Sequence, residues 1–191
     1  VLVAMAACIA LVLVIERLAY RPLRSAPRLN SLITAIAISL LLQNLGQIVF
    51  GADPKSYPEI LKSTIYRPYG ALAISRNSIV VLGTALILML VLNWVVYRTK
   101  MGTAMRAVSE NPPMASLIGV PVNVVIAFTF ALGAAMAGAG GVLYAMSYPK
   151  IDPIMGLMPG LKAFVAAVLG GIGSVKGAVV GGIVIGLSEA A

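Results

Sequence analysis

The chain has 191 residues, of which 60% are hydrophobic and only 10% are charged, and its formal net charge is +8. It contains one cysteine and no histidine, which excludes an intrachain disulfide and any metal or proton-relay site built on histidine. Its apolar runs approach the roughly 20 helical residues needed to cross a hydrocarbon core of about 30 Å. The composition therefore predicts an all-α, polytopic integral membrane protein, because backbone groups in lipid must bond within their own helix.

Four apolar runs predict membrane-spanning helices, in chain order at residues 1–15, 32–50, 79–97 and 124–144. The sequence begins with Val1 inside the first run and stops at Ala191 inside a later apolar tract. We therefore expect residues 1–191 to be one transmembrane domain within a fragment truncated at both termini. A signal peptide is the competing interpretation of the first run, but it lacks a basic start and a small-residue cleavage site.

Basic residues gather in the loops that follow the first and third predicted spans. The residues concerned are Arg17, Arg21, Arg24, Arg28, Arg98, Lys100 and Arg106. The positive-inside rule places both loops in the cytoplasm, and the longer mixed-charge loop at 51–78 then falls on the other side. Membrane anchoring accounts for the positive charge, so the sequence gives no reason to expect nucleic-acid binding.

The second span carries a narrow polar stripe in which the residues recur every fourth position. Its members are Ser39, Gln43 and Gln47. Such side chains either bond to a neighbouring helix or line a translocation pathway, and both uses keep them away from lipid.

The cytoplasmic segment 98–123 predicts a bent pair of short amphipathic helices. Met101, Ala104, Met105 and Val108 share one face of the first helix. Asn111 and Pro112 resemble an N-cap and first helical residue of a second helix. That helix has an apolar face of Met114, Leu117 and Ile118 and ends at Gly119. Periodicity alone leaves open whether the pair lies in the headgroup region or docks to a partner.

Small residues four positions apart predict close packing between helices in the C-terminal half. The packing candidates are Gly133, Ala137, Gly138, Gly141, Gly177 and Gly181.

The tract that follows Gly160 predicts a broken or re-entrant helix over 160–173 and a further apolar helix over 178–191. A break at membrane depth exposes backbone groups that can hold a polar solute. We therefore expect Gly170, Gly171, Gly173 and Ser174 to form part of a translocation pathway. The same stretch is not a nucleotide-binding loop, because Val175 precedes Lys176 and Gly177 follows it where the motif requires Gly and Ser or Thr.

Three stretches carry a family resemblance that covers most of the chain. They are YRPLRSAPRLNSLITAIAISLLLQNL, MRAVSENPPMASLIGVPVNVVIAFTFALGAAMAGAGGVLYAM and GLKAFVAAVLGGIGSVKGAVVGGIVIG. In this order they resemble the LivH-type permease subunit of branched-chain amino acid ABC importers. Ala115 and Gly119 also fit the final A-x-x-x-G of the loop by which importer permeases contact their ATPases.

The resemblance implies a bacterial inner-membrane permease that works with other subunits. These would be a sibling LivM-like permease, two cytoplasmic ATPase subunits that hold ATP and magnesium, and a periplasmic amino-acid-binding protein. This chain itself would then bind no cofactor. The residues that would couple it to the ATPases are Arg106, Ala107, Glu110, Ala115 and Gly119.

The predicted function is therefore a non-enzymatic transmembrane subunit that passes branched-chain amino acids, and no nucleophile, metal cluster or carboxylate pair indicates otherwise. Related systems carry other amino acids, amides or urea, so the solute remains open. The alternative is a secondary carrier or channel for a small polar solute, which would need no ATPase.

Overall fold

The computed structural model describes residues 1–25, 28–56, 65–66, 74–148, 150–171 and 173–190. Its chain divides into two compact units, one formed by residues 1–42 and 56–150 and the other by residues 43–55 and 151–191. Ile172 and Ala191, which fall inside the predicted C-terminal helices, and most of the loop at 51–78 lie outside the described residues.

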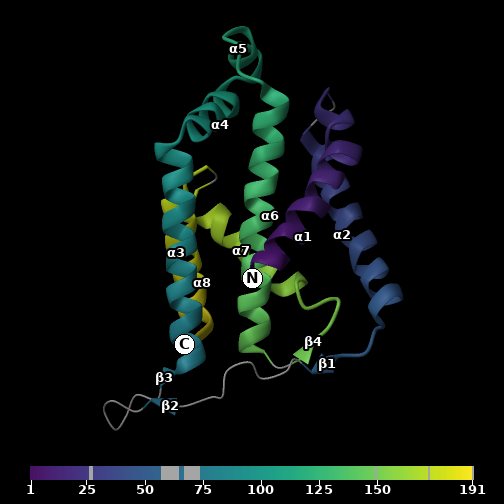
Figure 1. Ribbon diagram of the computed structural model, residues 1–191, viewed down its shortest axis with the longest axis vertical. Helices are drawn as coiled ribbons and strands as arrows, with labels where there is room; N and C mark the ends of the chain where they lie inside the picture. Colours follow the sequence, from purple (N-terminus) through teal and green to yellow (C-terminus); the bar gives the residue numbers. More distant parts are fainter. Residues whose placement is uncertain (26–27, 57–64, 67–73, 149, 172, 191) are drawn as a thin grey trace. The chain divides into compact units, whose positions relative to one another are not determined.

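Helices dominate the described chain (Figure 1). The α-helices are α1 (Leu2–Ile15), α2 (Arg28–Phe50), α3 (Arg76–Arg98), α4 (Lys100–Glu110), α5 (Pro112–Leu117), α6 (Val122–Ser147), α7 (Leu157–Leu169) and α8 (Val175–Ala190). Short extended pieces are β1 (Lys55–Ser56), β2 (Ile65–Tyr66), β3 (Ile74–Ser75) and β4 (Lys150–Ile151). Strands β2 and β3 pair antiparallel, with Ile65 opposite Ser75 and Tyr66 opposite Ile74.

Within the described part of the chain, four helices are long and apolar enough to cross a membrane. These segments are Leu2–Tyr20, Ile33–Phe50, Ser78–Arg98 and Val122–Ser147. Each overlaps one of the four predicted spans almost completely, so the all-α membrane fold is confirmed.

The first span differs in its end point from the predicted 1–15. The chain continues as a π-helix, Glu16–Tyr20, in which the Arg21 amide donates to the Glu16 carbonyl at 2.8 Å. A 3₁₀ turn, Pro22–Ser25, follows. Pro22 has no backbone N–H and cannot continue the ladder, which explains why the regular helix stops there. Glu16 is buried by this extension, with only 5% of its surface exposed, rather than lying in an open loop.

Helix α6 is the centre of the first unit, and α1 packs along it. A Cβ added at Gly138 would meet the Ala4 carbonyl oxygen at 3.0 Å and the Met5 Cα at 3.1 Å. The rings of Tyr20 and Phe130 extend this contact, with their centroids 5.0 Å apart. The two helices approach closely because small residues line the buried face of α6, as expected where packing replaces hydrophobic exclusion of water.

Candidate functional site

Helices α4 and α5 lie at one end of the first unit, where they connect the end of α3 to the start of α6 (Figure 1). Thr99 is the N-cap of α4, and its hydroxyl oxygen accepts the Gly102 amide at 3.0 Å and donates to the Val95 carbonyl. A Cβ at Gly102 would overlap the carbonyl oxygens of Val95 and Val96. The turn from α3 into α4 therefore requires glycine at 102, a residue that the sequence reasoning missed although it lies only three residues after the cap.

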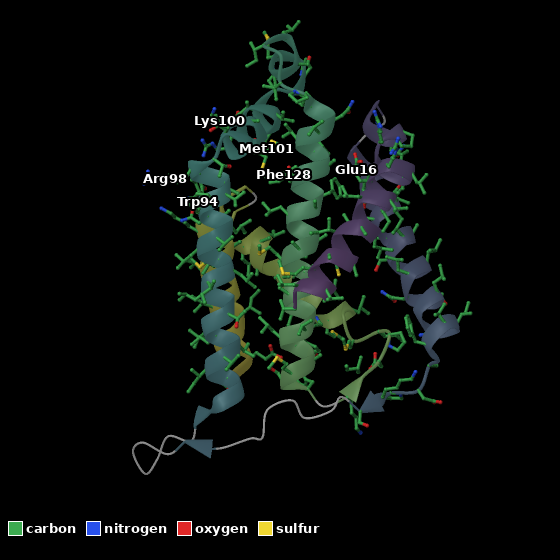
Figure 2. The ribbon with its side chains drawn as sticks, viewed as in Figure 1. Glu16, Trp94, Arg98, Lys100, Met101 and Phe128 are labelled. Carbon is green, nitrogen blue, oxygen red and sulfur yellow. The ribbon has the colours of Figure 1, made fainter. Side chains whose placement is uncertain are left out.

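The apolar face of α4 is used within the chain. Val108, Ala115 and Val125 form a buried cluster that joins α4, α5 and α6, and Met101, Ala104, Met105 and Ala107 pack against it. Figure 2 shows Met101 on the side of α4 that faces α6, near Phe128, while Trp94 and Arg98 lie on the outer side of α3. The predicted apolar face of α4 is confirmed, and within this chain it packs against α5 and α6.

Helix α5 differs from α4 because its apolar face is exposed. The Asn111 side chain accepts the Met114 amide at 3.1 Å, which confirms the predicted N-cap, and Pro112 is the first helical residue. Ala115 is 3% exposed and holds α5 on the buried cluster. On the other face, the apolar side chains are largely exposed at Met114 (61%), Leu117 (80%) and Ile118 (76%). These three residues, called the α5 face below, form a small apolar surface at the tip of the unit.

Gly119 ends α5 in a left-handed conformation, with φ of +86°. Its amide donates to the Ser116 carbonyl at 3.1 Å, and the Val120 amide donates to the Ala115 carbonyl at 3.0 Å. These two bonds are the Schellman pattern, and Val120 packs against the buried cluster to which Ala115 belongs. A Cβ at Gly119 would meet nothing within 4 Å. Within this chain, glycine is therefore required for its backbone angle and not for a close approach.

The charged coupling candidates lie on α4. Arg106 donates to the Val96 carbonyl at 3.1 Å, and its guanidinium carbon lies 5.5 Å from the centroid of the Tyr97 ring. Arg106 therefore ties α4 to the end of α3. Glu110 is exposed at the last turn of α4. Of the five predicted coupling residues, Ala115 belongs to the buried cluster and Ala107 packs against it, whereas Gly119 directly follows the α5 face in the chain.

The predicted break in the C-terminal tract is present in the second unit as the turn between α7 and α8. Gly171 and Gly173 have φ of +91° and +99°, values that L side chains rarely adopt. The Ser174 hydroxyl oxygen accepts the Gly177 amide at 3.1 Å and so begins α8. Gly171, Gly173 and Ser174 are exposed, whereas Gly170 is partly covered because it packs on α8. Their role in a pathway stays a prediction.

Close packing of α7 on α8 depends on glycines. A Cβ at Gly177 would overlap the Gly170 carbonyl, and a Cβ at Gly181 would overlap the Ala166 carbonyl. Gly138 has the corresponding position against α1. By contrast, Gly133 and Gly141 meet nothing within 4 Å among the described residues, and Ala137 is exposed. Any packing role for these three residues stays a prediction.

Both interpretations of the polar stripe of α2, bonding to a neighbouring helix or lining a pathway, stay predictions. Ser39 is exposed, whereas Gln43 and Gln47 are partly buried. Ser39 and Gln43 each already interact with other groups of the chain.

Two cavities border the described helices. One, of about 530 Å³, lies in the first unit between the end of α1 and the start of α6 and is lined by Glu16, Arg17, Arg21 and Asn123 among others. The other, of about 250 Å³, lies in the second unit and is lined by Asp53, Lys55 and Asp152 together with Phe50 and Pro153. Among the described residues, no group of His, Cys, Asp and Glu could hold a metal ion.

Residues 1–191 match the family described as the permease component of the branched-chain amino acid transport system. The chain belongs to this family. It is 41% identical over 179 residues to the high-affinity branched-chain amino acid transport system permease protein LivH of Escherichia coli K12. It is 40% identical over 179 residues to the high-affinity branched-chain amino acid transport system permease protein BraD of Pseudomonas aeruginosa.

Each of these alignments covers 92% of this chain and 58% of the relative, so the chain spans less than two thirds of their length. A probable branched-chain amino acid transport permease protein of Methanocaldococcus jannaschii is 34% identical over 191 residues. No solved structure matches the chain. The LivH-type resemblance seen in the sequence is confirmed.

Proposed function

We propose that this chain is the membrane-spanning permease part of an ATP-binding-cassette importer for branched-chain amino acids in the bacterial inner membrane. It would work with a sibling permease, two ATPase subunits that bind ATP and magnesium, and a periplasmic binding protein that delivers the solute. Its relatives are named for branched-chain amino acid transport, which supports this substrate class.

The observation that carries the proposal is the α5 face at the tip of the α4–α5 helix pair. Helices that present an apolar face at i, i+3 and i+4 are recognised by grooves in partner proteins. The α5 face has this spacing, and all three of its side chains are more than half exposed. A soluble partner with an apolar groove, such as an ATPase subunit, fits this surface.

The connections of α5 are suited to transmitting force. Ala115 seats α5 on the cluster with α4 and α6, and the Gly119 cap fixes the path of the chain into α6. Thr99, Gly102 and Arg106 fix α4 to the end of α3. A displacement of the α5 face would therefore move the ends of α3 and α6 together, since packed interiors deform little.

The experiment is purification of the intact protein from its native membrane, followed by identification of the proteins that accompany it. We expect two ATPases and a sibling permease. Reconstituted vesicles loaded with ATP should accumulate leucine when the binding protein is present, and vesicles without ATP should not. Uptake that continues without ATP would contradict the proposal and would favour the secondary carrier or channel.

A further inference from the structure

An ion pair crosses the α7–α8 hairpin. The Lys162 ammonium lies 2.5 Å from a carboxylate oxygen of Glu189. Lys162 is the one charged residue of α7, and the residues of α8 between Gly177 and Leu187 carry no charge. Ionisable residues in apolar membrane segments are costly and usually mark a substrate or ion route, because a purely structural contact is made more cheaply by apolar residues.

Close packing of α7 on α8 fixes the position of the Lys162–Glu189 pair within the hairpin. Backbone contacts of Gly177 with Gly170 and of Gly181 with Ala166 fix the two helices near the turn. Lys162 lies two turns before the end of α7, roughly 10 Å along the helix axis. The side chains of Lys162 and Glu189 remain 48% and 60% exposed, so both heads can be reached by a solute.

We propose that Lys162 and Glu189 bind the zwitterionic backbone of the transported amino acid, an inference that rests on the proposed function. The substrate carboxylate takes the place of Glu189 at Lys162, and the substrate ammonium takes the place of Lys162 at Glu189. One internal ion pair becomes two pairs with the solute, and the net charge of the site stays at zero. No proton or electron needs to be transferred.

The surroundings of the pair suit an aliphatic side chain. Val165 lies one turn after Lys162 on α7, and Met158 lies one turn before it, both with exposed apolar side chains. Ile185 lies one turn before Glu189 on α8 and is partly buried. A charged amino acid would bring a third charge with no partner here, so the pair favours neutral amino acids over lysine or glutamate.

The experiment uses the whole transporter with its binding protein in ATP-loaded vesicles, and a photoactivatable diazirine analogue of leucine that keeps both backbone charges. Each of the variants Lys162→Gln and Glu189→Gln should raise the KM for leucine about 10- to 100-fold, the effect of losing one charge-assisted hydrogen bond. Lys176→Gln, the same change at an exposed lysine of α8, should alter KM less than about twofold. Membrane abundance and binding-protein-stimulated ATP hydrolysis verify that each variant is assembled.

A structural ion pair would behave differently in the charge-swapped double variant K162E/E189K. A pair that merely joins the helices is restored by the swap, and leucine uptake would recover. A pair that binds L-amino acids in one orientation is not restored, and uptake should stay low. The diazirine analogue should label residues 157–190 in the wild type and lose this labelling in Lys162→Gln.

Recovery of uptake in the swapped variant, or labelling confined to other helices, would overturn the inference while leaving the proposed function intact. A wild-type transporter that moves no branched-chain amino acid would overturn the proposed function, and this inference with it.

Discussion

Glycine is required both at the end of α5 and where α7 packs on α8, and the physical reasons differ. Gly119 is needed for a positive φ, while the space around its missing side chain is open. Gly170, Gly177 and Gly181 have no side chain because another backbone occupies that space. The first kind of glycine shapes a surface that faces outward, and the second kind closes two helices on each other. Substitutions distinguish the two reasons, because backbone strain at one residue costs less free energy of folding than forcing two helix backbones apart.

The largest effect is expected for Gly177→Ala. Its new Cβ would overlap the Gly170 carbonyl, so α7 and α8 must separate, at a cost at the upper end of the range of about 1–3 kcal/mol seen for overpacking. The apparent melting temperature of the purified protein should fall clearly, and protease should cut the hairpin faster. Gly182→Ala is the matched control, because a Cβ there meets nothing within 4 Å. Equal stability of the two variants would refute the contact.

Leu117→Glu should have the next largest effect, on transport and not on folding. It places a charge in the α5 face, and the loss of a central contact typically costs about 2 kcal/mol or more, which corresponds to a fall in coupled uptake of roughly 30-fold. Binding-protein-stimulated ATP hydrolysis and leucine uptake measure the coupling. Ser116→Glu adds the same charge on the opposite side of α5 and should keep both activities. Unchanged uptake in Leu117→Glu at normal membrane levels would exclude the α5 face as the docking surface.

Gly119→Ala should destabilise by about 1 kcal/mol, because alanine is strained at positive φ while its methyl group meets no other atom. Gly119→Asn should cost less, since asparagine tolerates this region better. Thermal melting of the intact protein measures the difference in stability between the two variants. A bulky residue at Gly119 should in addition uncouple ATP hydrolysis from uptake, because the Gly119 cap fixes the path of the chain from α5 into α6. If even Gly119→Ala abolishes uptake without loss of stability, a partner backbone approaches Gly119.

Arg106→Gln should have the smallest effect. The exposed guanidinium bonds to the Val96 carbonyl and lies over Tyr97, and such contacts contribute about 0.5–1 kcal/mol at exposed sites. The melting temperature should fall slightly, with uptake reduced less than in Leu117→Glu. Lys100→Gln, a second cation at the start of the same helix, is the control. An effect of Arg106→Gln on uptake as large as that of Leu117→Glu would place Arg106 in the docking surface instead of in the α3–α4 connection.

Local sequence rules predicted much of this architecture. The lengths of the apolar runs identified the four long helices, and Asn111 with Pro112 identified the start of α5, because caps depend on neighbouring residues alone. The regular helix α1 ends at Ile15 as predicted, but its continuation as a π-helix over Glu16–Tyr20 was not foreseen, since such a turn has no clear sequence signal. Gly102 was missed as well, because its need for glycine comes from the carbonyls of Val95 and Val96 across a turn.

The sequence by itself determined that the chain is a bundle of apolar helices with a bent helical pair on one side, since helix length, period and capping are properties of short stretches. Only the tertiary structure decided which faces are used inside the chain. Several faces of α6 carry small residues four positions apart, and the sequence does not distinguish among them. In the structure α1 packs on the face that contains Gly138 and not on Gly133 or Gly141. Both short helices have an apolar face, and burial of Val108 and Ala115 against Val125 leaves the α5 face as the outward one. Periodicity shows that a helix has an apolar face, whereas packing against particular neighbours determines which residues that face contacts.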